Sequence, residues 1–336
     1  MVARMTIKEI ARLSGVGVST VSRVLNKRPD VNEDTRGRVM EVIERYGYEP
    51  NSNAKHLKQL STDCVAVIVR GRNNLFFSGI LELLQKRIEA AGLRFLPHYI
   101  DENDDEAAAA LRVYAERKVR GIIFMGGCHT DNGAMLSRLP IPCVYSTVNA
   151  AEGYAPNVSS VSVDDRQGAK KAVDYLFDCG HENMVILSGE TQGCNMAHQR
   201  YLGVLDSFKE HGKTIESSRV LVSPFSFSCA YERIKEYTGP DYTAIFAMSD
   251  TMAIGAARAL MDSGKRVPED VSVIGYDGIE LAQYYHPALA TMRQPQQELA
   301  DRSVELLLES MDTDCAPKHI QLETELIQGA SVKHIS

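Results

Sequence analysis

Four polar side chains recur along one face of a short predicted helix near the amino terminus. They are Ser19, Ser22, Arg23 and Asn26, at positions i, i+3, i+4 and i+7. Residues at this spacing share one side of a helix, and the face carries hydroxyl, guanidinium and amide groups but no carboxylate. Such groups can read base edges in the major groove of DNA or bind its phosphates. We therefore predict a surface that contacts nucleic acid; a helical bundle with one polar helix is the alternative.

The segments around this face complete a pattern of three helices. Thr6 and Glu9 fit a capping box that begins the first helix, and a turn at residues 14–17 separates it from the second. A third helix is expected from about Asn32. Its core face is predicted to contain Val39, Val42, Ile43 and Tyr46. A helix, a short turn, a second helix and a supporting helix form the helix-turn-helix plan.

Charge is distributed unevenly along the chain. Residues 1–60 contain 11 Lys and Arg against 7 Asp and Glu, whereas the whole chain carries a net charge of −7. A small basic head on an acidic body fits a DNA-binding module joined to a domain that need not touch DNA.

The cysteines and the apolar runs indicate the compartment. The seven cysteines are scattered and form no CxxC pair, which is typical of a reducing compartment rather than of a disulfide framework or a zinc site. No apolar run approaches the ~18 residues that a membrane-spanning helix requires, and the amino terminus lacks an apolar export-signal core. We therefore expect a cytoplasmic protein with no membrane partner, no metal site and no cofactor.

Beyond residue 63, apolar runs alternate with amphipathic helical segments, and the alternation continues over two successive stretches. Runs such as CVAVIVR at 64–70 are typical of parallel strands that are buried on both faces. The pattern predicts two doubly wound α/β lobes, with a ligand crevice where the carboxyl ends of the strands meet. The loops expected at these ends span residues 73–77, 146–149, 189–196, 249–250 and 275–277.

These patterns divide the chain into three parts. We expect an all-α helix-turn-helix head at residues 1–49, a linker at 50–61 and a ligand-binding body at 62–336. Within the body, we expect one lobe at about 62–162 and 292–322, and the other at about 163–291 and 323–336.

Two adjacent segments closely resemble the LacI/GalR family of bacterial repressors. They are IKEIARLSGVGVSTVSRVLN at 7–26 and VNEDTRGRVMEVIERYGYEPN at 31–51. Blocks of the body, such as VPEDVSVIGYDG at 267–278, also match the family. The resemblance implies a body like the periplasmic binding proteins, and a homodimeric transcriptional regulator, more often a repressor, that binds a pseudo-palindromic operator under the control of a small-molecule effector.

The resemblance also assigns residues to DNA. The residues that it assigns to base reading are Val18, Ser19, Ser22 and Arg23. Positions that contact phosphates are Thr6, Thr20, Asn26, Asn32 and Thr35. In the linker, a hinge helix would form on the operator, with contacts from Asn51, Ala54 and Leu57, and Leu57 would wedge into the minor groove. The chain departs from the family at Gly17, where a serine is usual.

By position, eight residues of the body fall where the family contacts its effector. They are Phe76, Phe77, Ser146, Met196, Arg200, Phe225, Ser249 and Asp277. Aromatic faces would pack on a sugar or a purine, Arg200 would offer a fork to hydroxyls or a carboxylate, and Asp277 would accept hydrogen bonds from hydroxyls. Alternatively, the phenylalanines belong to the core and Asp277 caps a turn. A sugar or sugar derivative is favoured. A purine and an organic acid stay as alternatives, because Ser146 stands where several sugar-binding members carry aspartate.

Other classes of protein fit the sequence less well. An enzyme is disfavoured because the motifs GxGxxG, GxxxxGK[ST], GxSxG and HExxH are missing. An exported binding protein would carry an export signal and lack the head, and a purely architectural DNA binder would not need an acidic body with a pocket.

Overall fold

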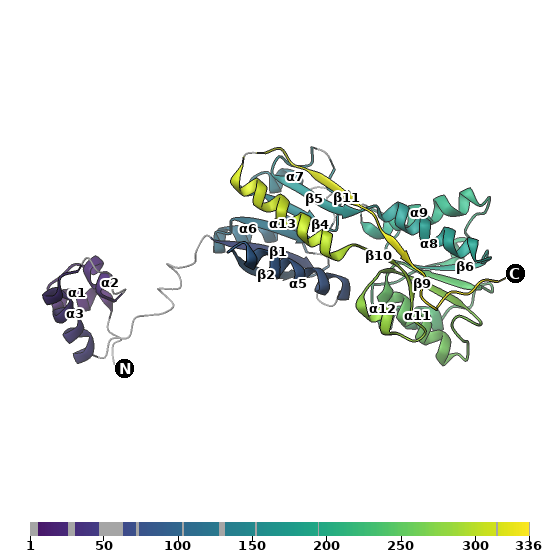
Figure 1. Ribbon diagram of the computed structural model, residues 1–336, viewed down its shortest axis with the longest axis horizontal. Coiled ribbons are helices and arrows are strands. Elements are labelled where there is room, and N and C mark those ends of the chain that lie inside the picture. The colour runs from purple at the N-terminus through teal and green to yellow at the C-terminus, as the bar shows by residue number, and fades with distance from the viewer. Residues whose placement is uncertain are drawn as a thin grey trace. The chain divides into compact units, whose positions relative to one another are not determined.

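The computed structural model describes residues 6–25, 31–46, 63–71, 74–102, 104–127, 132–151, 153–193, 195–313 and 315–335. The chain divides into two compact units, residues 1–61 and residues 62–336 (Figure 1). Four residues assigned to DNA contact, Asn26, Asn51, Ala54 and Leu57, lie outside the described residues, as does the whole expected linker.

The first unit contains the three predicted helices. They are α1 (Ile7–Ser14), α2 (Val18–Leu25) and α3 (Glu33–Tyr46). The helices pack around a core of Ile10, Ala11, Val21, Val24 and Val39. The expectation that Tyr46 faces this core is wrong, because its side chain is 47% exposed in the last turn of α3.

The ends of α1 follow from its sequence. The predicted capping box is present, since the Thr6 hydroxyl accepts from the backbone N–H of Glu9 and the Glu9 carboxylate accepts from the backbone N–H of Thr6 at 2.7 Å. Gly15 ends the helix at a φ of 65°, a left-handed conformation that glycine adopts without the steric cost a Cβ imposes. The turn that follows sets the start of α2.

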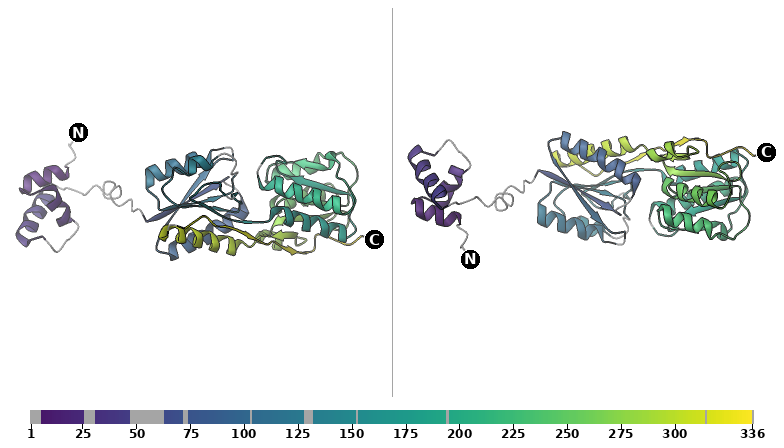
Figure 2. Two further views of the ribbon diagram at one scale, coloured as in Figure 1. Left: turned by 90° about the horizontal axis from the view of Figure 1, so that it is seen from above. Right: turned by 90° about the horizontal axis from the view of Figure 1, so that it is seen from below.

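The first lobe of the second unit is built on a sheet of six parallel strands in the order β11-β5-β4-β3-β1-β2. The strands are β1 (Cys64–Arg70), β2 (Arg94–Ile100), β3 (Gly121–Met125), β4 (Cys143–Ser146), β5 (Val158–Val163) and β11 (His319–Leu322). On one face lie α5 (Leu75–Ala90) and α13 (Gln296–Asp312), and on the other α6 (Glu106–Arg117) and α7 (Gly133–Leu136) (Figure 2).

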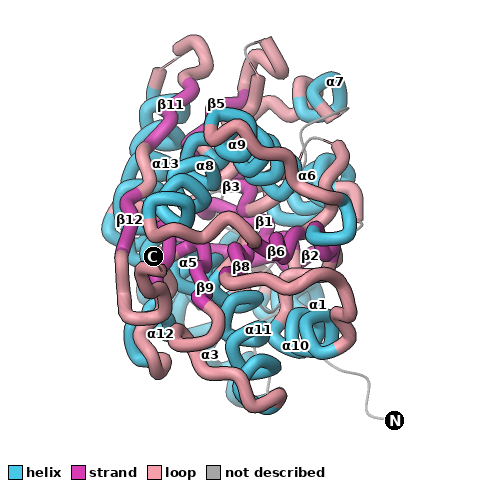
Figure 3. Tube along the Cα trace, turned by 90° about the vertical axis from the view of Figure 1, so that its right-hand side faces the viewer, coloured by secondary structure: helices cyan, strands magenta, loops and turns pink. Residues whose placement is uncertain are grey.

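The second lobe has a sheet in the order β12-β10-β9-β8-β6-β7. Its strands are β6 (Met184–Ser188), β7 (Val220–Val222), β8 (Ala244–Ala247), β9 (Ser272–Asp277), β10 (Ala290–Arg293) and β12 (Glu325–Ile327). The helices are α8 (Asp165–Asp178) and α9 (Met196–Glu210) on one face, and α10 (Phe227–Lys235) and α11 (Asp250–Asp262) on the other, with the short η1 (Ser217–Arg219) and α12 (Glu280–Tyr284). Figure 3 shows the strands between their helices.

The two doubly wound lobes are confirmed, with several differences in detail. The expected loop at 275–277 forms the last three residues of β9. The strand β12 runs antiparallel to β10, although the expected sheet is parallel throughout. Residues 292–293 belong to the second lobe rather than the first, because they pair with β9. Of the expected loop at 73–77, residues 75–77 form the first turn of α5, because the Asn74 side chain accepts from two backbone N–H groups and so caps that helix; residue 73 lies outside the described residues. Among the described helices, none is long and apolar enough to cross a membrane.

Candidate nucleic-acid interface and ligand cleft

The helix α2 presents the predicted polar face. Val21 and Val24 are buried in the core of the head, whereas Ser19 and Arg23 are exposed and Val18 is 41% exposed. Thr20 and Ser22 are half-buried beside them. The predicted division of this helix into an apolar and a polar face is therefore confirmed for its described residues.

Two of the predicted phosphate contacts begin helices. Thr6 caps α1, and the side-chain oxygen of Asn32 accepts from the backbone N–H of Asp34 at 2.8 Å at the start of α3. Thr35 follows in the first turn of α3 and is half-buried. Backbone N–H groups and the helix dipole favour anions at such ends. Here the side chains of Thr6 and Asn32 already accept from N–H groups of the first turns, which also carry the carboxylates of Glu9, Glu33 and Asp34.

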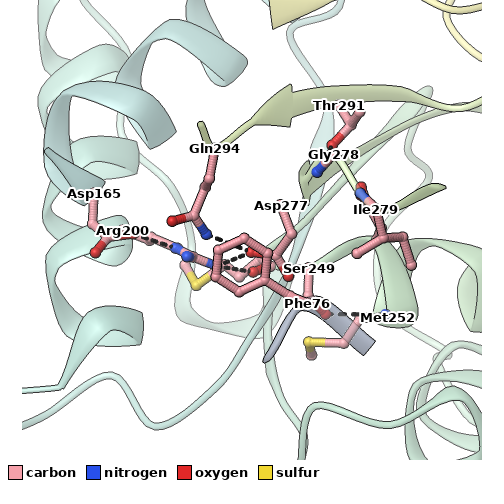
Figure 4. A network of polar contacts seen from close by, with 12 residues as sticks. Phe76, Asp165, Arg200, Ser249, Met252, Asp277, Gly278, Ile279, Thr291 and Gln294 are labelled. Atoms are coloured by element: carbon pink, nitrogen blue, oxygen red, sulfur yellow. Dashed lines mark hydrogen bonds and ion pairs between the residues drawn. The ribbon is translucent and has the colours of Figure 1, made fainter. Parts of the chain in front are cut away.

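In the body, the structure brings Arg200 and Asp277 together (Figure 4). Arg200, on α9, is only 2% exposed, and its Nη1 lies 3.4 Å from Oδ1 of Asp277 at the end of β9. Its Nε donates to Asp165 at 2.8 Å, and its guanidinium lies 3.7 Å from the ring centroid of Tyr276. Gln294 donates to the same Asp277 oxygen at 2.8 Å. A single cation therefore serves two buried carboxylates.

Burial and neighbouring charges change the acidities in this network. Burial raises the pKa of Asp277 to about 6, and the nearby Arg200 guanidinium only partly opposes it. Burial likewise raises the pKa of Asp165. Burial opposes the charge of Arg200 itself, but Asp165 and Asp277 outweigh it and raise the arginine pKa. The site therefore holds a permanent cation beside a carboxylate that titrates near neutral pH.

The three phenylalanines predicted to contact the effector lie among apolar groups. Phe76 and Phe77 are 4% and 5% exposed and belong to the core. Phe225 is half-buried beside Gly189, where an added Cβ would meet its ring at 2.4 Å. The aromatic faces are therefore used in packing in this structure.

Ser249 and Ser146 differ in their hydrogen bonding. The Ser249 hydroxyl caps α11, where it accepts from the backbone N–H of Met252 at 3.2 Å. Ser146 is fully buried at the end of β4, and its hydroxyl has no hydrogen-bond partner among the described residues.

A cavity of about 280 Å³ opens between the lobes near this network. Its lining contains Thr147, Val148, Asn149, Ala151, Val163, Asp164, Asp165, Arg166, Asn195, Met196, Gln199 and Gln321. Of the predicted effector contacts, only Met196 lines it. A wider groove of about 670 Å³ runs along the start of α13. Its lining includes Arg302 and Glu305, which pair with one another at 3.0 Å. Each pocket touches the buried network, the smaller through Asp165 and the larger through Gln294. The smaller cavity is the better candidate for a ligand, because it is the more enclosed of the two.

Sequence reasoning missed Asp165 and Gln294, and it placed Tyr276 in a crevice loop without naming it as a contact. Asp165 is 35 residues from its partner Arg200, and no local motif links them. Gln294 stands in the block LATMRQP at 289–295 that resembles the family, so its place in a matching block was the available signal.

Comparisons with known proteins agree with this architecture. Residues 6–51 match the family described as bacterial regulatory proteins, lacI family, and residues 173–332 match the periplasmic binding protein-like domain. The chain is 35% identical to the transcriptional regulator MalR of Clostridium butyricum, over 98% of this chain and all of the relative. It is 31% identical to the transcriptional repressor PurR of Vibrio campbellii, over 98% of this chain and 99% of the relative.

Two solved structures superpose over nearly the whole chain. The complex of the regulator CelR with cellobiose has a TM-score of 0.71 and 28% identity, and covers 98% of this chain and all of that one. The lac repressor dimer bound to operator and the anti-inducer ONPF has a TM-score of 0.72 at 24% identity, with the same coverage, and supports the fold.

Proposed function

Because this chain belongs to the LacI family of bacterial regulatory proteins, we propose a specific way in which it carries out effector-controlled, DNA-binding regulation of transcription. Two copies bind a pseudo-palindromic operator, each placing α2 in a major groove. Bases are read by Val18, Ser19, Ser22 and Arg23. Thr6 is the first residue in the chain that contacts a phosphate. The observation that supports this most directly is the polar outer face of α2, which lacks carboxylates and is fixed by the buried Val21 and Val24.

The linker couples the body to the operator in this proposal. Asn51, Ala54 and Leu57 contact DNA when two linkers fold side by side, and Leu57 enters the minor groove at the centre of the site. The effector sets how the two linkers are presented. A coupling of about 1–3 kcal/mol would change operator affinity by ~5–150-fold. The protein acts as a repressor in the cytoplasm, on the nucleoid, and has no catalytic activity.

We further propose that the effector is a sugar or a sugar derivative. The structural neighbour CelR is in complex with cellobiose, and a LacI family regulator of Enterococcus faecium, at 24% identity, has ribose bound. The network of Arg200, Asp277 and Gln294 offers donors and acceptors of the kind that bind hydroxyls. A purine or an organic acid is the alternative to a sugar.

Selection from a random duplex pool by the purified full chain tests the proposal. We expect enrichment of a palindrome with half-sites about one helical turn apart, and a change in enrichment when maltose, cellobiose, ribose or hypoxanthine is added. Substitution of Leu57 should weaken the preference at the central base step. Enrichment of an asymmetric site, or of no site under any condition, would contradict the proposed mode of binding.

A further inference from the structure

The backbone turns sharply where the second lobe presents Asp277. At the end of β9, Asp277 has a φ of 109° and Gly278 has one of 69°, so two successive residues have positive φ. A Cβ has a steric cost in that region, and surrounding contacts must hold such a residue there. The turn at residues 277–279 therefore needs support from outside, and that support determines where the Asp277 carboxylate points.

Two buried side chains hold this turn by its backbone. Oδ2 of Asp250 accepts from the N–H of Ile279 at 2.8 Å. The Thr291 hydroxyl on β10 accepts from the N–H of Gly278 at 3.2 Å (Figure 4). Asp250 is 0% exposed and Thr291 is 2% exposed, so both hydrogen bonds are shielded from water.

The hydrogen bond of Asp250 does not serve its own helix. Asp250 is the first residue of α11, where an acidic side chain interacts favourably with the helix dipole, but the cap of that helix is the Ser249 hydroxyl, which accepts from Met252. The bond of Asp250 instead reaches Ile279, 29 residues further along the chain. An added Cβ at Gly275 on β9 would meet Oδ1 of Asp250 at 2.3 Å. Asp250 is therefore packed directly against β9.

Asp250 is also too deeply buried to contact a ligand in this structure. It lines neither the cavity nor the groove described above, and its Oδ1 has no hydrogen-bond partner in the part of the chain that the structure describes. Burial, and then the neighbouring Asp277 carboxylate, raises the pKa of Asp250 well above its ordinary value, which favours the neutral acid. What this side chain supplies is an acceptor for the backbone rather than a charge.

We propose that Asp250 is a positioning residue of the effector site, which together with Thr291 holds this turn and so aims the Asp277 carboxylate. The inference rests on the proposed function, in which Asp277 contacts the effector. Oδ1 of Asp277 lies 3.4 Å from Nη1 of Arg200 and 2.8 Å from Nε2 of Gln294, and a relaxed turn would draw the carboxylate away from both. Loss of either support should therefore weaken effector binding, although neither supporting side chain touches the effector.

Four variants of the full chain test this role. Asp250→Ala and Thr291→Val each remove one acceptor, and Thr291→Val is nearly isosteric, so it carries the test if Asp250→Ala does not fold. Asp250→Asn keeps an amide oxygen for the N–H of Ile279 and should rescue what Asp250→Ala loses. Ser331→Ala is the matched control, because it removes another buried hydroxyl, which donates to the Val273 carbonyl at 2.6 Å near the start of β9 rather than its end.

Operator binding of each variant is measured with and without maltose, cellobiose, ribose and hypoxanthine. For a probe that changes the operator affinity of the unaltered chain, we expect its half-maximal concentration to rise at least ~10-fold in Asp250→Ala and Thr291→Val, and less than ~3-fold in the other two variants. A normal response in Thr291→Val, or an equal loss in Asp250→Asn or Ser331→Ala, overturns the positioning role. If no probe changes the operator affinity of the unaltered chain, the proposed function fails and this inference fails with it.

Amide hydrogen exchange tests the turn without any ligand. Peptides that contain residues 277–279 should exchange at least ~10-fold faster in Asp250→Ala and Thr291→Val than in Ser331→Ala, because the two N–H groups of the turn lose their acceptors. Unchanged exchange in both variants would overturn the support of the turn, whatever the effector response of the same proteins.

Discussion

Replacing Arg200 with methionine should destabilise the body strongly at neutral pH and much less in acid. The substitution keeps an apolar side chain of similar length against Tyr276 but leaves Asp165 and Asp277 buried without their cation. Removing one partner of a buried ion pair costs ~3–5 kcal/mol. For a domain of this size, the loss corresponds to a fall in melting temperature of about 6–20 °C.

The pH dependence follows from the sign of the acidity shift. The folded-state pKa of Asp277 is raised to about 6, above its ordinary value of 3.8, so the folded chain binds this proton more tightly than the unfolded chain does. The free energy of unfolding therefore falls as pH rises between these values, by about 3 kcal/mol from this group, and stays low above them. Without Arg200, the folded-state pKa of Asp277 rises further, and the fall in the free energy of unfolding extends to higher pH.

Thermal and urea unfolding of both proteins at pH 5 and pH 7.5 would measure this. We expect Arg200→Met to lower the free energy of unfolding mainly at pH 7.5, because at pH 5 the carboxylate of Asp277 is largely protonated. Arg302→Met is the control: Arg302 is half-exposed, its Nη1 lies 3.0 Å from Glu305, and surface pairs contribute ~0–1 kcal/mol. An equal deficit at both pH values would refute the electrostatic reasoning and attribute the loss to packing.

Three further predictions concern separate parts of the chain. Arg23→Ala should weaken binding to the selected operator by ~1–3 kcal/mol and relax its sequence preference, which anisotropy titrations against mismatched duplexes would detect; uniform weakening on all duplexes would instead indicate a phosphate contact. Asp277→Asn should remove the effector's influence on operator affinity while operator binding without effector persists, and a normal response would show that Asp277 lies outside the effector site. Gly203→Ala should destabilise the body by ~1–3 kcal/mol in urea unfolding, because its Cβ would approach the Arg166 carbonyl oxygen at 2.0 Å, where α8 and α9 pack together; an unchanged midpoint would mean that the two helices separate at little cost.

Local periodicity predicted much of the fold. The spacing in α2 identified both of its faces, and the apolar run at 64–70 identified β1, because in each case burial repeats with the geometry of the element itself. Asn74 shows where such reasoning fails. The Asn74 side chain caps α5, so the helix starts before its amphipathic pattern does. Phe76 and Phe77 therefore lie in the core.

The site was predictable in part. The resemblance identified Arg200 and Asp277, which the structure places 3.4 Å apart. A lone arginine after a loop would ordinarily lie on the surface, and this reasoning favoured the cleft for Arg200. Its near-complete burial depends on Asp165, which lies on another helix and is 35 residues away. A contact of that kind is set by how α8 and α9 pack, and no short stretch of sequence encodes it.

The order of the strands has a consequence for synthesis of the chain. Each lobe receives an edge strand from the last segment, since β11 (His319–Leu322) pairs with β5 and β12 (Glu325–Ile327) pairs with β10. On the ribosome, where domains form as the chain emerges, the helices α1 to α3 are made long before either sheet can be completed. A nascent chain can therefore form its head while neither lobe of the body is whole, and a premature stop after α13 would deprive both lobes of a strand at once.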